Sequence, residues 1–238
     1  MAADALHFLR LMQWLSPAYP VGAYTYSHGL EWAVEEGRVG DARGFAAWAE
    51  DVLNHGAGRN DAILLAAAWR APDPGALAEL DALARALAPS RERALEAAAQ
   101  GAAFWQVCRD TWDGGGARPG ADAGCGAGAA ARLLPDLDPA PVYPVAVGAA
   151  AAGAGLPLQD TALAYLHALA GNLTAAAIRL VPLGQTEGQA VLAGLAPLCA
   201  DLAETALHET PESLGACTFL ADIASMKHET QYSRLFRS

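Results

Sequence analysis

The sequence predicts an all-α fold, and three features carry that prediction. Apolar residues recur at helical spacing along most of the 238-residue chain, as at Leu6, Leu9, Met12 and Leu15. No segment alternates apolar and polar residues for long enough to indicate a strand, and the dipeptides typical of hairpin turns are missing. No repeat of fixed period suggests a solenoid. We therefore expect a single domain, residues 1–238, built as an irregular orthogonal bundle of about ten helices.

Start and stop signals divide the first half of the chain. A helix over residues 4–15 ends at Ser16-Pro17, and a segment from 22 to 36 ends at Gly37, where a left-handed residue closes a helix. Asp41 is a predicted N-cap. A further helix begins at Asn60 or Asp61 and runs through residue 69.

The next two helices also have cap residues. Asp73-Pro74 places an N-cap before a proline in the first turn, and that helix runs to residue 88 before Pro89. Ser90 caps the following helix, which ends near Trp112. Residues 113–128 are rich in glycine and have no apolar periodicity, so we expect a flexible surface loop there.

The second half contains the longest predicted helix. A short Ala-rich helix covers 143–154, and the run from 158 to 180 is predicted to be the central helix of the bundle, ended or kinked at Pro182. Thr186 and Gln189 have capping-box spacing and predict the start of a helix that reaches about residue 208.

Charge and composition narrow the function classes. The chain has 15 Lys and Arg against 26 Asp and Glu, a formal net charge of −11, which repels nucleic-acid backbones. The N-terminus lacks the pattern of a secretory signal, and no stretch of about 20 uncharged apolar residues indicates a membrane span. We expect a cytoplasmic protein whose four separated cysteines are reduced.

Neither a metal site nor a catalytic set is predicted. The six histidines and four cysteines show no ligand spacing that would start a converging site, so we expect no resident metal or cofactor. Ser27 and His28 are adjacent, but adjacent helical side chains point about 100° apart, so a nucleophile with its base is not expected. The chain is therefore predicted not to be an enzyme.

The C-terminal tail, about residues 223–238, is dense in functional groups. Polar and charged side chains crowd together there with Leu235 and Phe236, and Arg, Tyr and Phe are typical of protein interfaces. One interpretation is a partner-binding tail that is mobile in the free protein and ordered in a complex. The alternative is a C-terminal helix or strand that docks on its own core.

The N-terminal half holds a second candidate interaction segment. Prolines on both sides of Tyr19 stiffen the loop that leads to Tyr24 and Tyr26, which could bind a partner or pack internally. Glu31 and Glu35, one helical turn apart and beside Glu36, form either a solvated acidic face or a docking surface for basic residues.

Three separated segments resemble the UreF family of urease accessory proteins. They are Leu11-Met-Gln-Trp-Leu-Ser-Pro-Ala-Tyr-Pro-Val-Gly-Ala-Tyr-Thr-Tyr-Ser-His-Gly-Leu-Glu-Trp32, Val181-Pro-Leu-Gly-Gln-Thr-Glu-Gly-Gln189 and Asp222-Ile-Ala-Ser-Met-Lys-His-Glu-Thr-Gln-Tyr-Ser-Arg-Leu-Phe-Arg-Ser238. Their order and spacing extend the resemblance over nearly the whole chain. The region from Ser90 to the glycine-rich stretch keeps only the helical character of the family.

The resemblance implies a nickel-insertion chaperone that forms a homodimer and bridges UreD (also called UreH), the GTPase UreG and apo-urease during GTP-dependent assembly. Two alternatives remain: a stand-alone helical metallochaperone or enzyme, and a protein that regulates GTP hydrolysis directly through Arg179 or Arg234. The candidate partner-binding residues are Tyr19, Tyr24, Tyr26, His28, Glu31, Glu35, Arg179, Gln185, Lys227, His228, Glu229, Tyr232, Arg234, Leu235 and Phe236.

Overall fold

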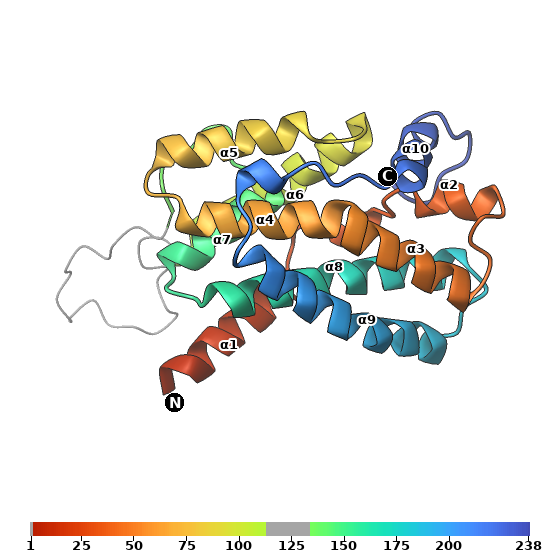
Figure 1. Ribbon diagram of the computed structural model, residues 1–238, viewed down its shortest axis with the longest axis horizontal. Helices are drawn as coiled ribbons and strands as arrows, with labels where there is room; N and C mark the ends of the chain where they lie inside the picture. Colours follow the sequence, from red (N-terminus) through yellow and green to blue (C-terminus); the bar gives the residue numbers. More distant parts are fainter. Residues whose placement is uncertain (1, 113–133) are drawn as a thin grey trace.

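The predicted all-α fold is confirmed in a computed structural model that describes residues 2–112 and 134–238 (Figure 1). The described residues contain no strand. Their α-helices are α1 Ala2–Trp14, α2 Leu30–Glu35, α3 Ala42–His55, α4 Ala57–Arg70, α5 Pro74–Ala86, α6 Arg91–Trp112, α7 Tyr143–Gly153, α8 Leu158–Leu180, α9 Gln185–Ala206 and α10 Phe219–His228. Two short 3₁₀ helices, η1 Ala23–Thr25 and η2 Pro211–Ser213, complete the order. The predicted loop at 113–128 lies outside the described residues.

Three predicted caps are present. The Asp41 carboxylate accepts from the backbone N–H of Gly44 at 2.7 Å, and Asp73 does the same for Ala76 at 2.9 Å. The Ser90 hydroxyl accepts from the backbone N–H of Arg93 at 3.2 Å. Each satisfies an N–H that the first turn of a helix leaves free.

The segment from 22 to 36 is not one helix, contrary to the prediction. His28 has φ 57° and Gly29 has φ 79°, both left-handed, and they separate η1 from α2. A Cβ on Gly29 would lie 2.6 Å from the backbone N of Ser225, so only glycine lets α2 approach α10 this closely. The glycine needed for this contact therefore interrupts the helical pattern.

Two predicted helix starts are also wrong. Helix α4 begins at Ala57, because the Asn60 side chain bonds the backbone of Gly215 and Ala216 instead of capping its own helix. Helix α9 begins at Gln185, and the Glu187 carboxylate accepts from the backbone N–H of Gly184 at 3.1 Å, so Thr186 is not the cap. Both errors are local and leave the helices themselves in place.

The core lies where α4, α6, α7 and α8 meet. Helix α7 is buried from Pro144 to Ala151 and packs against α4, α6 and α8. Helix α8, the predicted central helix, also contacts α1, α2, α3 and α9. By length and composition alone, α8 could cross a membrane, but 56% of its most apolar 18-residue stretch is buried inside the protein.

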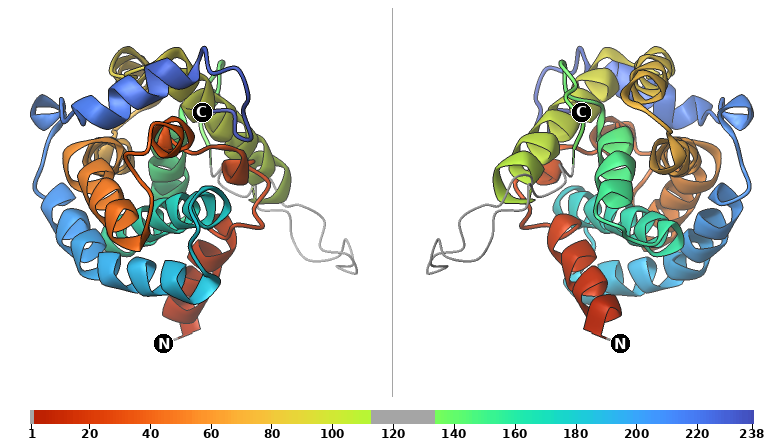
Figure 2. Two further views of the ribbon diagram at one scale, coloured as in Figure 1. Left: turned by 90° about the vertical axis from the view of Figure 1, so that its right-hand side faces the viewer. Right: turned by 90° about the vertical axis from the view of Figure 1, so that its left-hand side faces the viewer.

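The two ends of the described chain differ in how they are packed. Helix α1 projects from the body in both side views (Figure 2), and its Trp14 end is anchored edge-on against Phe104 and Trp112. The other end runs from α10 back to α2, where the C-terminus is marked in Figure 1.

Candidate partner-binding site

The C-terminal tail is docked on the chain's own core. The backbone N–H of Arg237 donates to the Thr25 carbonyl at 2.8 Å, and the N–H of Ser27 donates to the Ser238 carbonyl at 2.6 Å. Phe236 is buried. In this structure the tail is docked on the core, as in the alternative interpretation; its mobility in the free protein stays a prediction.

Glu31 is the main acceptor for the tail. Its Oε1 accepts from the backbone N–H of Leu235 at 2.6 Å, and its Oε2 accepts from that of Phe236 at 2.8 Å. It is buried at the interface of α2 with α10, so the interpretation of Glu31 as part of an exposed acidic face is wrong. Glu35 and Glu36, at the end of α2, are exposed.

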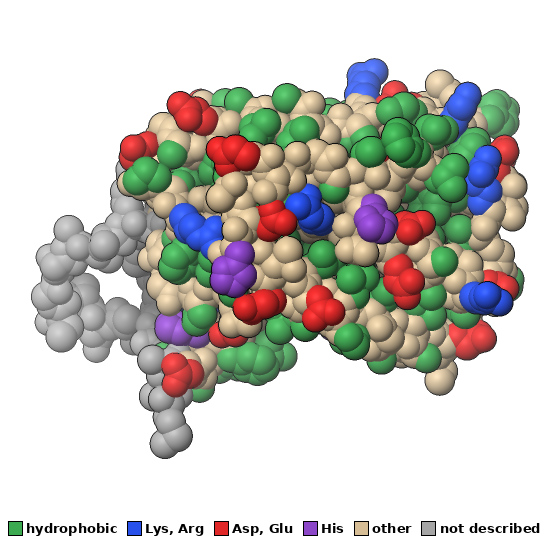
Figure 3. Space-filling model, viewed as in Figure 1, with side chains coloured by type: hydrophobic (Ala, Val, Ile, Leu, Met, Phe, Trp, Pro, Cys, Tyr) green, Lys and Arg blue, Asp and Glu red, His purple; other side chains and the backbone are tan. Residues whose placement is uncertain are grey.

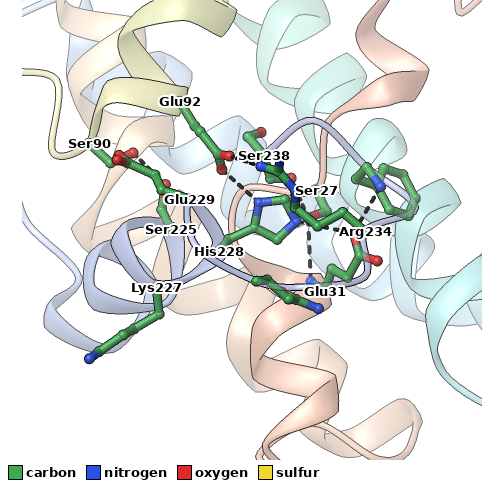
Figure 4. Close-up of polar contacts among 12 residues, drawn as sticks. Ser27, Glu31, Ser90, Glu92, Ser225, Lys227, His228, Glu229, Arg234 and Ser238 are labelled. Atoms are coloured by element: carbon green, nitrogen blue, oxygen red, sulfur yellow. Dashed lines mark hydrogen bonds and ion pairs between the residues drawn. The ribbon is translucent and has the colours of Figure 1, made fainter.

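His228 lies between two carboxylates (Figure 4). Its Nε2 is 3.1 Å from Glu31 Oε2 and its Nδ1 is 2.6 Å from Glu92 Oε2, with the side chain fully buried. Each ring nitrogen of His228 is therefore within hydrogen-bond distance of a carboxylate. Arg234 contacts the same group of residues, with Nη1 2.8 Å from Glu92 Oε1.

Glu96 is the third buried carboxylate, and we call Glu31, Glu92 and Glu96 the carboxylate cluster. Glu96 pairs with Arg93, accepts from the Ser238 hydroxyl at 2.9 Å and lies 3.0 Å from His28 Nε2. Burial acts to raise the pKa of Glu96, but the charge of Arg93 and the hydrogen bonds outweigh it and lower the pKa to about 2. Burial, followed by the charge of Arg93, lowers the pKa of His28.

Two cavities, of about 130 and 50 Å³, share His28, Asp61 and Arg93 in their walls. Burial raises the pKa of Asp61 to about 6, although Arg93 and the hydrogen bond from Tyr165 act in the opposite direction. The Tyr165 hydroxyl donates to Asp61 at 2.8 Å. These groups form a buried polar layer beneath the docked tail.

Ser27 and His28 do not form a nucleophile and base. The Ser27 hydroxyl donates to the Ser238 carbonyl, whereas His28 is turned to Glu96. In the part of the chain that the structure describes, no group of three or more His, Cys, Asp or Glu side chains could hold a metal ion. The chemistry that these residues support is tail docking.

The candidate residues divide into an inner and an outer set. Tyr19 is in the core, with its hydroxyl 3.5 Å from Cys108 Sγ, and burial raises its pKa well above the usual range. The buried members are Tyr19, Tyr26, His28, Glu31, His228 and Phe236. Those that reach the surface are Tyr24, Glu35, Arg179, Gln185, Lys227, Tyr232, Arg234 and Leu235, and Glu229 is half-buried.

Exposed apolar residues on α10 were not among the candidates. Helix α10 turns small or polar side chains inward, including Ala221, Ala224 and His228, and leaves large apolar ones exposed. The exposed residues are Phe219, Leu220, Ile223 and Met226. Their spacing at 219, 223 and 226 is one helical stripe and could have been found in the sequence.

We group these exposed residues with those of the tail that follows α10. Hydrophobic side chains gather at the upper right of the molecule, over α10 (Figure 3). Tyr232 and Leu235 of the tail are also exposed, and Arg234 is partly so. We call this the α10 surface: Phe219, Leu220, Ile223, Met226, Tyr232, Arg234 and Leu235.

Comparison with known proteins identifies the family. The UreF family model matches residues 39–196. A urease accessory protein UreF from Methylobacterium radiotolerans is 50% identical over 240 residues, covering 99% of both chains. One from Ruegeria pomeroyi is 48% identical over 97% of this chain and 96% of its own, and one from Cereibacter sphaeroides is 49% identical over 97% and 98%. These relatives bear the name of accessory proteins, not of enzymes. The chain therefore belongs to the UreF family, whose members are accessory proteins of urease, and this implies a role in urease maturation.

Proposed function

We propose that this chain is a non-enzymatic scaffold of urease maturation in the cytoplasm. In this proposal it binds UreD (UreH) through the α10 surface, and the complex recruits the GTPase UreG and docks on apo-urease for GTP-dependent nickel insertion. Family membership supports the maturation role. The observation that carries the proposed binding site is the exposed apolar face of α10 beside the docked tail.

The α10 surface has the composition of an interface. Phe219 is 77% exposed, Tyr232 is fully exposed, and Ile223 and Met226 are about half exposed. Large apolar side chains at the surface gain free energy when a partner covers them, by roughly 25 cal/mol per Å². Aromatic residues, Met and Arg are the types enriched in interfaces. The carboxylate cluster holds the tail in one conformation through hydrogen bonds, so the tail loses little conformational entropy when a partner binds.

The test is a titration of UreD with variants of the α10 surface. Phe219→Ala and Tyr232→Ala should each weaken binding by about 2 kcal/mol or more, roughly 30-fold in Kd, because truncating an aromatic anchor removes much of its buried area. Calorimetry or surface plasmon resonance measures the affinity, and activation of co-expressed urease should fall with it. Circular dichroism should be unchanged, since both side chains are exposed.

Leu83→Ala is the matched control, because Leu83 is a partly exposed apolar residue on α5. It should bind UreD with the affinity of the unmodified chain. If Phe219→Ala and Tyr232→Ala also bind normally, the α10 surface is not the UreD site. If the unmodified chain does not bind UreD at all, the scaffold proposal itself fails.

A second copy of the chain is the occupant we propose for an apolar groove of about 610 Å³ between α1, α8 and α9. Its walls include Leu11, Met12, Leu163 and Leu192. Phe8 of the projecting helix α1 is also a wall residue, and α1 exposes Leu6 and Leu9 as well. One protomer thus carries a projecting apolar helix and an apolar groove, and a two-fold pairing covers both at once.

Phe8→Asp should therefore convert a dimer into a monomer, because each copy of the symmetric interface would receive a buried charge without a partner. Analytical ultracentrifugation measures the mass. Ala47→Asp, at an exposed position on α3, is the control and should remain dimeric. A monomeric unmodified chain, or a dimeric Phe8→Asp variant, would contradict the groove as the dimer interface.

Direct action on GTP hydrolysis would require a different arrangement of both candidate arginines. Arg234 is paired with Glu92, and Arg179 contacts Tyr24 and Phe236. Either guanidinium would have to leave these contacts to reach a nucleotide. The geometry therefore favours the contacts within the chain over a nucleotide for both guanidinium groups.

A further inference from the structure

Arg179 contacts two segments that are about two hundred positions apart in the sequence. Its Nη1 donates to the backbone carbonyl of Tyr24 in η1 at 3.0 Å. Its guanidinium carbon lies 4.3 Å from the centroid of the Phe236 ring in the tail. The loop and the tail also bond each other, through Arg237 to Thr25 and Ser27 to Ser238. The three segments therefore meet at one side chain.

Arginine is suited to joining a carbonyl and an aromatic ring. The planar guanidinium donates hydrogen bonds in its plane and stacks on rings with its face, so one side chain makes both contacts at once. A lysine ammonium can make either contact but lacks the flat face for stacking. Arg179 also occupies the last turn of α8, where the helix dipole favours a positive charge.

We propose that Arg179 is a positioning residue that couples the loop carrying Tyr24, residues 22–27, to the tail, residues 229–238. The loop and the tail undock together. When either the Tyr24 carbonyl or the Phe236 ring moves away, the guanidinium loses one of its two contacts and holds the other segment less firmly. Tyr24 is 69% exposed, so a partner protein can bind its ring. Binding there fixes the loop and, through Arg179, also stabilises the docked tail. That consequence for partner binding rests on the function proposed above, whereas the coupling is a property of the free chain.

Hydrogen exchange of the full chain without any partner tests the coupling. The reporters are the amide of Arg237, which bonds the loop, and the amides of Thr25 and Tyr26 within it. Arg179→Gln and Phe236→Leu should each speed exchange at both segments by about 3- to 10-fold, the range expected for loss of a cation–π contact and its linked hydrogen bond. The double variant should show no more than the larger single effect, because the two residues act as one unit.

Three comparisons make the result decisive. Arg179→Lys keeps the charge and should restore only part of the protection. Arg38→Gln removes another surface arginine beside an aromatic ring, 5.9 Å from the Trp32 centroid, and should leave both reporters unchanged. The amide of Leu173, in the buried middle of α8, monitors global unfolding and should not change in any variant.

The coupling is refuted if Arg179→Gln speeds exchange in one segment only, or if the effects of the two single variants multiply. If the Phe236→Leu variant loses protection at Leu173, the comparison of Arg179→Gln with Arg179→Lys still decides, since both substitutions are at an exposed position. UreD binding is measured separately. Intact coupling without UreD binding would contradict the proposed function alone, and UreD binding without coupling would contradict this inference alone.

Discussion

Replacing Glu31 by alanine should lower the free energy of unfolding by about 2 to 5 kcal/mol, because each buried donor left without its acceptor costs about 1 to 3 kcal/mol. The variant leaves the buried ring of His228 with Glu92 as its remaining partner. It also strands the backbone N–H groups of Leu235 and Phe236, which lose their carboxylate acceptor. Urea unfolding followed by tryptophan fluorescence measures the loss.

Glu36→Ala provides the control for this change. Glu31 lies in the first turn of α2, and Glu36 directly follows the last residue of the same helix. Unlike Glu31, Glu36 has an exposed side chain. Its removal should change stability by within about ±0.5 kcal/mol. Equal effects of the two substitutions would show that Glu31 is solvated, as the sequence suggested, and that the carboxylate cluster does not hold the tail.

The helices could be predicted because their signals are local. Asp41, Asp73 and Ser90 act within three residues of their own position, and a periodic stripe needs no information from elsewhere in the chain. The predictions failed where a distant segment intervened. Asn60 is an example, since its side chain donates a hydrogen bond to the backbone carbonyl of Ala216, about 155 positions away, instead of capping a helix.

The site depends on such distant contacts almost entirely. Nothing in the sequence distinguishes Glu31 from Glu35 and Glu36. Glu31 is buried only because His228 and the tail pack against it in the folded chain. The same composition that indicates a partner-binding tail also suits a tail docked on its own core. The outward face of α10 is the exception, because its stripe is visible in the sequence but its direction depends on α2 and α6.

Gly29 is the position where backbone conformation most directly controls the site. Gly29→Ala should cost about 1 to 2 kcal/mol for the left-handed conformation and a further 1 to 3 for overpacking. The added Cβ would lie 2.6 Å from the backbone N of Ser225 and 3.0 Å from its Cα, and backbone atoms cannot turn aside as a side chain can. The strain separates α2 from α10, so the affinity for UreD should fall together with stability.

Gly37→Ala isolates the steric part of this effect. Gly37 has φ 71°, close to the 79° of Gly29, but a Cβ there would meet no atom within 4 Å. The two variants therefore share the conformational cost and differ in the clash with α10. Denaturant unfolding should show the larger loss for Gly29→Ala, and faster exchange of the Leu235 and Phe236 amides should accompany it only in that variant. The expectation fails if both variants lose the same stability and the Leu235 and Phe236 amides stay protected in Gly29→Ala. In that case the close approach of α2 to α10 is not what keeps the tail docked.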